Sequence, residues 1–248
     1  IYDLYYTGIS CGWTWGYGDT VSKNNRIEKN HIHDLGHGFL SDMGGIYTLG
    51  VQPGTVLRGN VIHDITAKNY GGWGIYLDEG SSHIIVENNI CYRTSNQCFN
   101  THYGRENTVR NNIFAFGRLA QVSLGRPENH LSFTLERNIL LCEGDQPAYA
   151  CARSGLQSRA FAADLNLLWN VSGPLRWTGP YHGGPGDGLT REELMRLGYD
   201  LHSVVADPLF ADAKAGDFTL PPGSPAWQLG FRPIDTSDVG PRPGYRKE

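Results

Sequence analysis

The sequence contains no apolar run that approaches the roughly eighteen residues needed for a membrane-spanning helix. It has no Lys/Arg-rich run either, and its formal net charge of −4 argues against nucleic acid or an anionic membrane as a partner. Its five cysteines form no CxxC pair, and its nine histidines lack the close pairing of a zinc site. We therefore expect no metal and no cofactor, and a neutral ligand fits this composition better than a charged one.

Helical signal is also scarce. One segment reads as a convincing helix, because Thr190-Arg191-Glu192-Glu193 forms a capping box that opens a short helix through about Leu197. The chain is instead rich in turn residues, with 32 glycines and 13 prolines among its 248 residues. This composition favours a β protein with many turns.

A short phrase built around one asparagine repeats along the chain. Its copies are centred on Asn30, Asn60, Asn89, Asn112 and Asn138, which are separated by 30, 29, 23 and 26 residues, and a weaker copy at Asn166 follows after 28. Each copy places aliphatic residues on both sides of a polar turn, as expected of a strand, a bend and another strand. Because no repeat contains an amphipathic helix, we predict an all-β, right-handed parallel β-helix whose stacked asparagines have a structural role.

A second strand in each repeat aligns as well. Since side chains alternate across a strand, one column points inward and its neighbours point to solvent. The predicted inward column is Ile9, Ile46, Ile75, Phe99 and Val122, and the predicted outward column is Ser10, Tyr47, Tyr76, Asn100 and Ser123. Two positions further on, the outward column reads Gly12, Leu49, Asp78, His102 and Gly125. This outer face is the candidate site.

Extra loop residues lie beside that face and predict a walled trough. Residues 36–44 and 66–73 are insertions before two of the strands, and an aromatic loop at 12–18 follows the first strand. Aromatic rings in such a trough suit sugars. The predicted sugar-binding residues are Trp13, Trp15, Tyr47, Trp73 and Tyr76 as platforms and Asn100 and His102 as polar contacts. His37 either reaches the site or caps its turn, and Trp13 or Trp15 either binds sugar or plugs the coil end.

Two aspartates on this face are candidates for cleaving a glycosidic bond. Glycoside hydrolysis uses a carboxylic acid and a carboxylate about 5–5.5 Å apart for retention or about 6.5–9.5 Å apart for inversion. Neighbouring rungs of a sheet lie about 4.8 Å apart. We predict Asp42 and Asp78 as the catalytic pair, provided that the 36–44 loop folds back over the trough, with Glu79 as a third candidate. His102, one rung above, would orient Asp78.

The repeat pattern weakens after Asn138. We predict two regions: residues 1–176 form the coils that carry the site, and residues 177–248 form a loop, the short helix and a C-terminal cap. Within the cap, residues 205–231 read as turn-rich strands that cover the last coil. Because the first residue is not Met and already lies in the repeat pattern, we expect a processed chain or part of a longer protein.

Several phrases resemble a known group of enzymes. The chain contains GISCGWTWG, SDMGGIYTLGVQPGT, GNVIHDI, GGWGIYLDEGSS and DPLFADAKAGDFTLPPGSPAWQLGF, which look like the parallel β-helix enzymes of bacterial carbohydrate degradation. Glycoside hydrolase family 141, with fucosidase and xylanase activities, looks nearest. The resemblance implies a secreted or periplasmic enzyme acting on a xylan- or fucose-containing plant or algal polysaccharide. It also implies further sequence before this chain, and carries the family's proposed aspartate pair onto Asp42 and Asp78.

Two other functions remain open at this point. One is a polysaccharide lyase or uronate epimerase on the same fold, which needs a basic residue or calcium to neutralise an acidic sugar. Arg105 and Arg126 lie just beyond the edge of the proposed face. The other is a non-catalytic, carbohydrate-binding β-helix.

Overall fold

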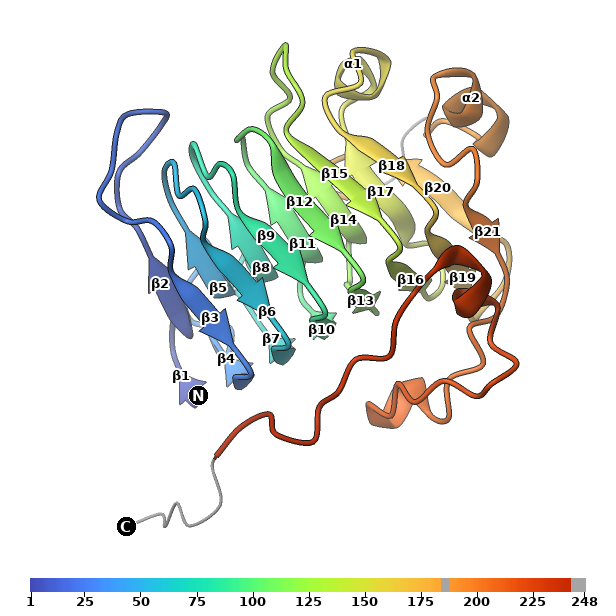
Figure 1. Cartoon of the computed structure of the whole chain (residues 1–248), viewed down its shortest axis with the longest axis horizontal. Coiled ribbons are helices and arrows are strands. Elements are labelled where there is room, and N and C mark those ends of the chain that lie inside the picture. Colours follow the sequence, from blue (N-terminus) through green and yellow to red (C-terminus); the bar gives the residue numbers. More distant parts are fainter. Residues whose placement is uncertain (184–187, 242–248) are drawn as a thin grey trace.

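The strands wind into a solenoid with three faces. The computed structural model describes residues 1–183 and 188–241, and within them all strands that pair in the three sheets run parallel. Each complete coil contributes one strand to each sheet, and the coils follow one another along the long axis of the molecule (Figure 1). The predicted parallel β-helix is therefore confirmed.

Sheet A and sheet C meet at the asparagine bend of each coil. Sheet A has eight strands and sheet C has six in the described residues. The strands of sheet A are β1 (Tyr2–Leu4), β4 (His31–Leu35), β7 (Val61–Ile65), β10 (Ile90–Thr94), β13 (Ile113–Ala115), β16 (Ile139–Cys142), β19 (Leu167–Asn170) and β21 (Val204–Val205). Those of sheet C are β3 (Arg26–Glu28), β6 (Val56–Arg58), β9 (Ile85–Glu87), β12 (Asn107–Arg110), β15 (Phe133–Glu136) and β18 (Ala162–Asp164).

Sheet B carries the candidate site on its outer face. Its seven strands are β2 (Ile9–Cys11), β5 (Met43–Thr48), β8 (Gly72–Leu77), β11 (Gln97–Thr101), β14 (Ala120–Leu124), β17 (Pro147–Cys151) and β20 (Arg176–Gly179). The predicted register is confirmed, because Ile75 pairs with Ile46 below and Phe99 above, and Tyr76 pairs with Tyr47 and Asn100. The predicted inward column lies in the core that fills the coil.

The asparagines at the bend form the predicted ladder. Asn89 Oδ1 accepts hydrogen bonds from the backbone nitrogen and Nδ2 of Asn60 at 3.0 and 2.9 Å. The same pattern links each rung to the next as far as Asn166, whose backbone nitrogen donates to Ser203 Oγ at 2.9 Å. At the bend, these side-chain amides pair with backbone N–H and C=O groups of the neighbouring coils, and so they hold the coils in register.

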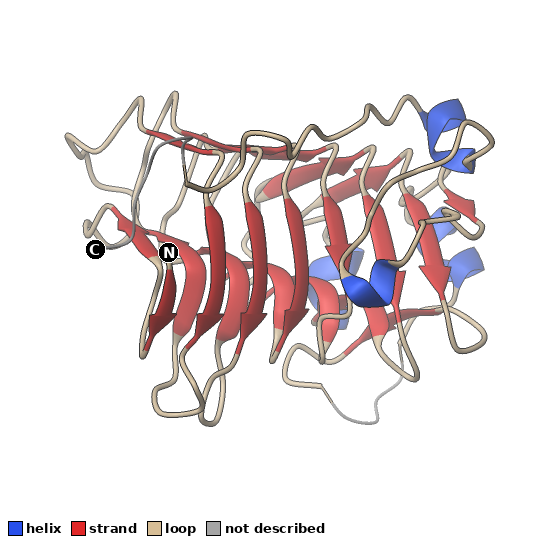
Figure 2. Ribbon diagram, turned by 90° about the horizontal axis from the view of Figure 1, so that it is seen from below, coloured by secondary structure: helices blue, strands red, loops and turns tan. Residues whose placement is uncertain are grey.

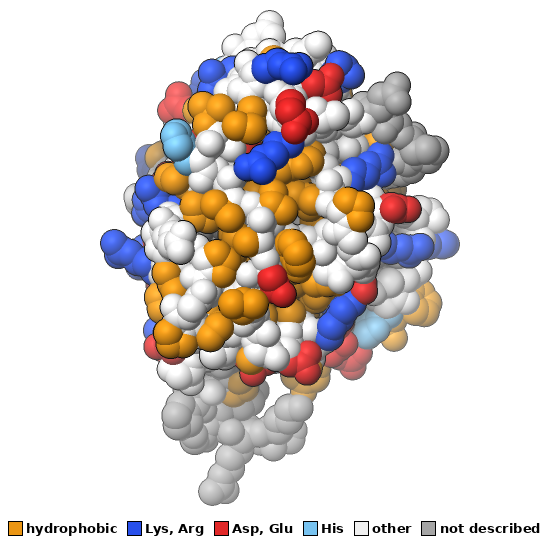
Figure 3. Space-filling view, turned by 90° about the vertical axis from the view of Figure 1, so that its right-hand side faces the viewer, with side chains coloured by type: hydrophobic (Ala, Val, Ile, Leu, Met, Phe, Trp, Pro, Cys, Tyr) orange, Lys and Arg blue, Asp and Glu red, His pale blue; other side chains and the backbone are white. Residues whose placement is uncertain are grey.

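The C-terminal part differs from the cap predicted for residues 205–231. β20 crosses the predicted boundary at residue 176, and β21 pairs with β19, so this part extends the same sheets. Helix α2 (Arg191–Arg196) begins with the predicted capping box, whereas helix α1 (Arg153–Gln157) was not predicted. Figure 3 views this end of the solenoid, where hydrophobic side chains gather in the middle of a surface ringed by charged ones.

After β21 the chain turns back along the outer face of sheet A. Residues 206–240 contain two 3-10 helices, Ala213–Ala215 and Pro225–Leu229, and the backbone nitrogen of Gly240 reaches the carbonyl of Lys29 at 3.1 Å. The described C-terminal segment thus returns toward the first coils (Figure 2). Rather than covering the last coil alone, it covers an apolar stripe along sheet A from β7 to β21, which could not stay in water without loss of stability.

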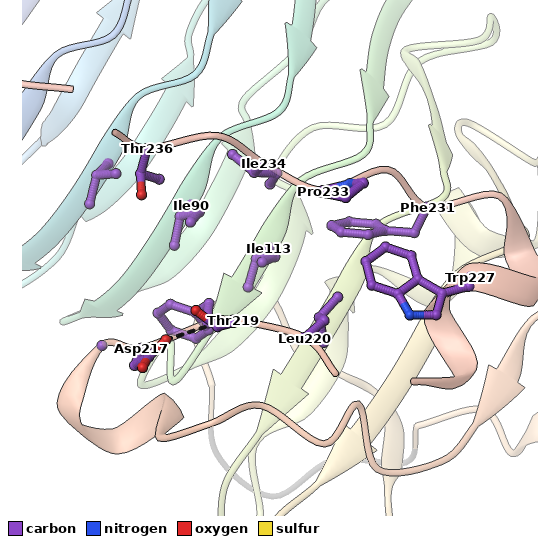
Figure 4. Close-up of a pocket in the computed structure, with 13 residues that line it drawn as sticks. Ile90, Ile113, Asp217, Thr219, Leu220, Trp227, Phe231, Pro233, Ile234 and Thr236 are labelled. Carbon is purple, nitrogen blue, oxygen red and sulfur yellow. Dashed lines mark hydrogen bonds between the residues drawn. The ribbon is translucent and has the colours of Figure 1, made fainter. Parts of the chain in front are cut away.

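Figure 4 shows the groove beneath this returning segment. Ile90 and Ile113 point into it from sheet A, and Leu220, Trp227 and Phe231 close it from the other side. No helix in the described residues is long and apolar enough to cross a membrane.

Candidate active site

A pocket of about 340 Å³ opens on the outer face of sheet B. Its lining includes most of the predicted site residues: Trp15, Asp42, Tyr47, Trp73, Tyr76, Asp78, Glu79 and His102. The remaining wall is made by Tyr70, Asn96, Gly125, Tyr181 and His182. Residues from loops on both sides of the sheet thus meet over the strands, as the insertions predicted.

A break in the in–out alternation of side chains along β8 decides which of them face this pocket. Gly74 and Ile75 both point into the coil, since a Cβ on Gly74 would lie 1.9 Å from the sulfur of Cys91 in the core. Alternation is therefore interrupted, and Trp73 shares the outer face with Tyr76, at a ring-centroid distance of 4.1 Å. Strict alternation would have placed Trp73 inside the coil.

Asp78 directly follows β8, and its carboxyl group is held by neighbours from three rungs. The hydroxyl of Tyr47 donates to Asp78 Oδ2 at 2.5 Å, and His102 Nδ1 lies 3.1 Å from Oδ1. Burial alone would raise the pKa of this 7 % exposed carboxyl group. Hydrogen bonds from His102, Tyr47 and Tyr76 outweigh burial and hold the Asp78 pKa below its ordinary value. Asp78 is therefore built to stay ionised.

Asp42 directly precedes β5, and its pKa is shifted in the opposite direction. Its backbone has a positive φ of 58°, its backbone nitrogen donates to Tyr70 O at 3.0 Å, and the hydroxyl of Tyr6 donates to its carbonyl at 2.8 Å. Burial of its side chain, followed by the charge of Asp78, raises the Asp42 pKa, although Tyr76 and His102 act against this. Asp42 is therefore the carboxyl group that retains its proton more readily.

One phenol joins the two aspartates. Tyr76 lines the same pocket and lowers the pKa of both carboxyl groups, and the pair in turn raises the Tyr76 pKa after the larger effect of burial. The requirement that the Asp42 loop fold over the trough is thus met. Two carboxyl groups in one pocket whose pKa values are moved in opposite directions form an arrangement suited to acid–base chemistry.

Glu79 lies at the rim beside the pair. Its side chain accepts a hydrogen bond from Tyr103 at 3.0 Å and lies 3.7 Å from His102 Nδ1. Its backbone carbonyl accepts from the nitrogens of Gly16 and Gly50 at 3.3 and 3.2 Å. These bonds fix the 12–18 loop across the ends of β5 and β8, and so place Trp15 at the pocket.

Three predicted sugar-binding residues, Trp13, His37 and Asn100, do not line the pocket. Trp13 packs against Tyr47 at a ring-centroid distance of 6.1 Å, and His37 instead pairs with Asp3 at 3.1 Å. Both Trp13 and Trp15 are more than half exposed, so neither plugs the coil.

The prediction that Asn100 faces solvent is wrong. Asn100 points out of the coil but is fully buried, because Tyr181 covers it. Ser123 is buried in the same column and donates to Asn100 Oδ1 at 2.7 Å, and Tyr47 and Tyr76 are also below a tenth exposed. The aromatic cluster over the sheet, rather than solvent, covers this column.

The 177–183 part of the loop supplies residues that the sequence did not assign to the site. Tyr181 and His182 line the pocket, although the sequence placed them only in the loop that begins at residue 177. Tyr70 was missed as an individual residue, but it stands inside the 66–73 insertion that predicted a wall. For Tyr181 and His182, the available signal was two neighbouring ring side chains in a loop rich in glycine and proline, just after the repeats.

Comparison with known proteins supports the fold. A family model described as right-handed beta helix region matches residues 9–132, which is half of the chain.

The chain belongs to the right-handed β-helix family.

Right-handed β-helix proteins include enzymes that act on polysaccharides, and the fold of this chain is compatible with that class. A search of curated proteins and a search of solved structures each found no match. The narrower resemblance to glycoside hydrolase family 141 therefore stays a prediction.

Within the described residues, no group of three or more His, Cys, Asp or Glu side chains is arranged to hold a metal ion. The His31 and His63 Nε2 atoms lie 2.8 Å apart on sheet A, which is a different face from the one that carries the pocket, and burial lowers the His31 pKa to about 4. All five cysteines are free, and four of them are buried.

Proposed function

We propose that this β-helix is a glycoside hydrolase that uses Asp42 and Asp78 to cleave a glycosidic bond. The observation that carries the proposal is their presence in one aromatic pocket with pKa values moved in opposite directions. A non-catalytic sugar-binding surface has no need of such a pair, and perturbed carboxyl groups in a cleft mark a candidate active site.

The opposite shifts assign a role to each aspartate. Asp42, with the raised pKa, gives its proton to the glycosidic oxygen as the bond to the anomeric carbon breaks. Asp78, which stays ionised, attacks that carbon and forms a covalent glycosyl ester. Water then cleaves the ester while the Asp42 carboxylate accepts a proton, which restores both groups.

The shared contact with Tyr76 favours this retaining route over inversion. Two carboxyl groups that interact with one phenol are close together, which suits the separation of about 5–5.5 Å used for retention better than the longer one. We therefore expect the first product to keep the anomeric configuration of the substrate, as read by proton NMR during the first turnovers.

The pocket favours a neutral sugar. In the part of the chain that the structure describes, its wall contains three carboxyl groups and no Lys or Arg side chain. A uronate would meet repulsion there, so this charge distribution argues against a uronate lyase or epimerase. Aromatic rings suit the C–H faces of sugars, and His102 and Asn96 supply polar contacts. We propose a xylan- or fucose-containing cell-wall polysaccharide, met outside the cell or in the periplasm, as the substrate.

The test is a hydrolysis screen with matched variants. The protein and its Asp42→Asn and Asp78→Asn forms are assayed on xylan, fucosylated pectin, uronate polymers and aryl glycosides, with Asp19→Asn as a control at an exposed loop carboxylate. We expect each site variant to lose about 10²–10⁴-fold in rate, the usual contribution of a positioned acid or base, and the control to keep its rate.

Two results would reject the proposal. Hydrolysis that survives both site substitutions would remove the assigned pair. An unsaturated product that absorbs in the ultraviolet would assign the protein to the lyases.

A further inference from the structure

The outer face of sheet B is closed on the side of the later coils. Asn100 on β11 and Ser123 on β14 continue the column of Tyr76, but both are buried. Tyr181 covers them: a Cβ on Gly125 would lie 2.9–3.2 Å from its ring and hydroxyl, and Gln97 Nε2 donates to its carbonyl at 3.0 Å. The absence of a side chain at Gly125 leaves the space that the Tyr181 ring fills.

Aromatic residues also stand on the side of the earlier coils. Trp13 packs on Tyr47, and the hydroxyl of Tyr6 bonds to the Asp42 carbonyl at 2.8 Å. At the two ends of the strands, Trp15 and Tyr70 form the remaining walls. The lining residues therefore close the pocket at both strand ends and on the side of the later coils, so the catalytic carboxyl groups do not lie in a groove that is open at both ends of the solenoid.

The size of the pocket agrees with this shape. Its volume of about 340 Å³ is at the lower end of the roughly 300–1,000 Å³ range of ligand pockets. An enzyme that cleaves inside a polymer must let the chain continue on both sides of the scissile bond. Here the chain can continue on one side, through the mouth of the pocket.

We propose that the site acts from the end of a chain or branch, with one terminal sugar in the pocket, and releases that sugar as a monosaccharide. This inference rests on the proposed hydrolase function. The terminal unit packs among Tyr47, Trp73 and Tyr76, the scissile oxygen lies at Asp42, and the leaving chain extends into solvent. Tyr181 determines this specificity because it occupies the place of the next unit inward.

The first experiment follows the products of hydrolysis. The protein is incubated with xylan, fucosylated pectin, and reduced xylo- and fucosyl-oligosaccharides, and products are separated by chromatography while polymer viscosity is recorded. We expect the monosaccharide as the first product, with viscosity unchanged while reducing ends accumulate. Oligosaccharides as first products, or an early fall in viscosity, would overturn this inference but leave the hydrolase proposal standing.

The wall is tested with Tyr181→Ala, and Tyr5→Ala serves as the control because Tyr5 is an exposed aromatic residue away from the pocket. Circular dichroism first establishes that both variants fold. We expect Tyr181→Ala to release oligosaccharides beside the monosaccharide, and Tyr5→Ala to give the product pattern of the unchanged protein. A folded Tyr181→Ala protein with the original product pattern would contradict the role of this wall.

Binding provides a readout that does not need turnover. Xylose, xylobiose, xylotetraose, xylohexaose and L-fucose are titrated calorimetrically into the Asp78→Asn protein. We expect affinity not to rise from the disaccharide to the hexasaccharide, because the further units lie in solvent. A rise of tenfold or more, about 1.4 kcal/mol, would indicate a groove and reject the inference. Failure of every sugar to bind, together with no hydrolysis, would reject the hydrolase proposal as well.

Discussion

Replacing Asn89 with alanine tests the ladder that holds the coils in register. Asn89 is fully buried, and its side chain makes four hydrogen bonds: it accepts two from Asn60 and donates one each to Leu57 O and Asn112 Oδ1. Alanine leaves the backbone N–H of Asn60 and one of its amide hydrogens without a partner inside the solenoid. At about 1–3 kcal/mol for each buried unpaired donor, the free energy of unfolding should fall by about 2–6 kcal/mol.

Asn30 is the matched control at the first rung. Its side chain makes two hydrogen bonds, to Glu28 O and Asn60 Oδ1, and Asn60 still receives the Asn30 backbone N–H at 3.0 Å after the substitution. At about 0.5–1.5 kcal/mol for each net hydrogen bond, Asn30→Ala should cost about 1–3 kcal/mol.

The assay is urea unfolding followed by circular dichroism, with both variants at the same pH and salt concentration. Urea midpoints and slopes give the two free energies of unfolding. If Asn89→Ala loses no more stability than Asn30→Ala, the ladder does not act as described, and the register must depend on the apolar core alone.

Three further predictions concern the site. Tyr47→Phe removes a hydrogen-bond donor to Asp78 and so raises the pKa of that carboxyl group, which should move the acid limb of the pH profile of kcat/KM to higher pH. An acid limb that does not move would contradict the role of this hydrogen bond. Asp42→Asn should raise the free energy of unfolding at pH 7, because a carboxyl group whose folded pKa is raised destabilises the fold once the pH passes its unfolded pKa. Urea unfolding should show that this gain vanishes at pH 3, where the carboxyl group is protonated in both states, and a gain independent of pH would refute the prediction. Gly80→Ala should raise KM, since a Cβ there would lie 1.9 Å from Gly16 O and displace the loop that carries Trp15. The control Gly144→Ala, which is also at positive φ but in open space, should leave KM unchanged, and equal effects of the two substitutions would reject the role of the loop.

The repeats made much of the fold predictable. A strand alternates with period two, and the asparagine bend returns once per coil, so Ile46, Ile75 and Phe99 could be aligned from the sequence and are paired in the structure. The same alignment predicted that Tyr76 and Asp78 lie on the outer face. These positions depend on short-range periodicity, which a sequence displays directly.

Positions set by tertiary contacts were not predictable in the same way. Tyr181 follows the repeats, and its place over Asn100 depends on the space above Gly125 and on its bond to Gln97. No spacing rule links residue 181 to residue 100, so Asn100 was wrongly predicted to face solvent. The return of the C-terminal segment along sheet A likewise depends on apolar contacts with distant coils, such as that between Phe218 and Tyr92.

The most direct test of the paired aspartates is to measure their pKa values by carbon-13 NMR in the unchanged protein and in Asp78→Asn. We predict that Asp42 titrates above, and Asp78 below, the reference carboxyl pKa of 3.8, and that the Asp42 pKa falls when the neighbouring charge is removed. An Asp42 pKa that is the same in both proteins would show that the two groups do not interact, and would contradict their assignment as one catalytic pair.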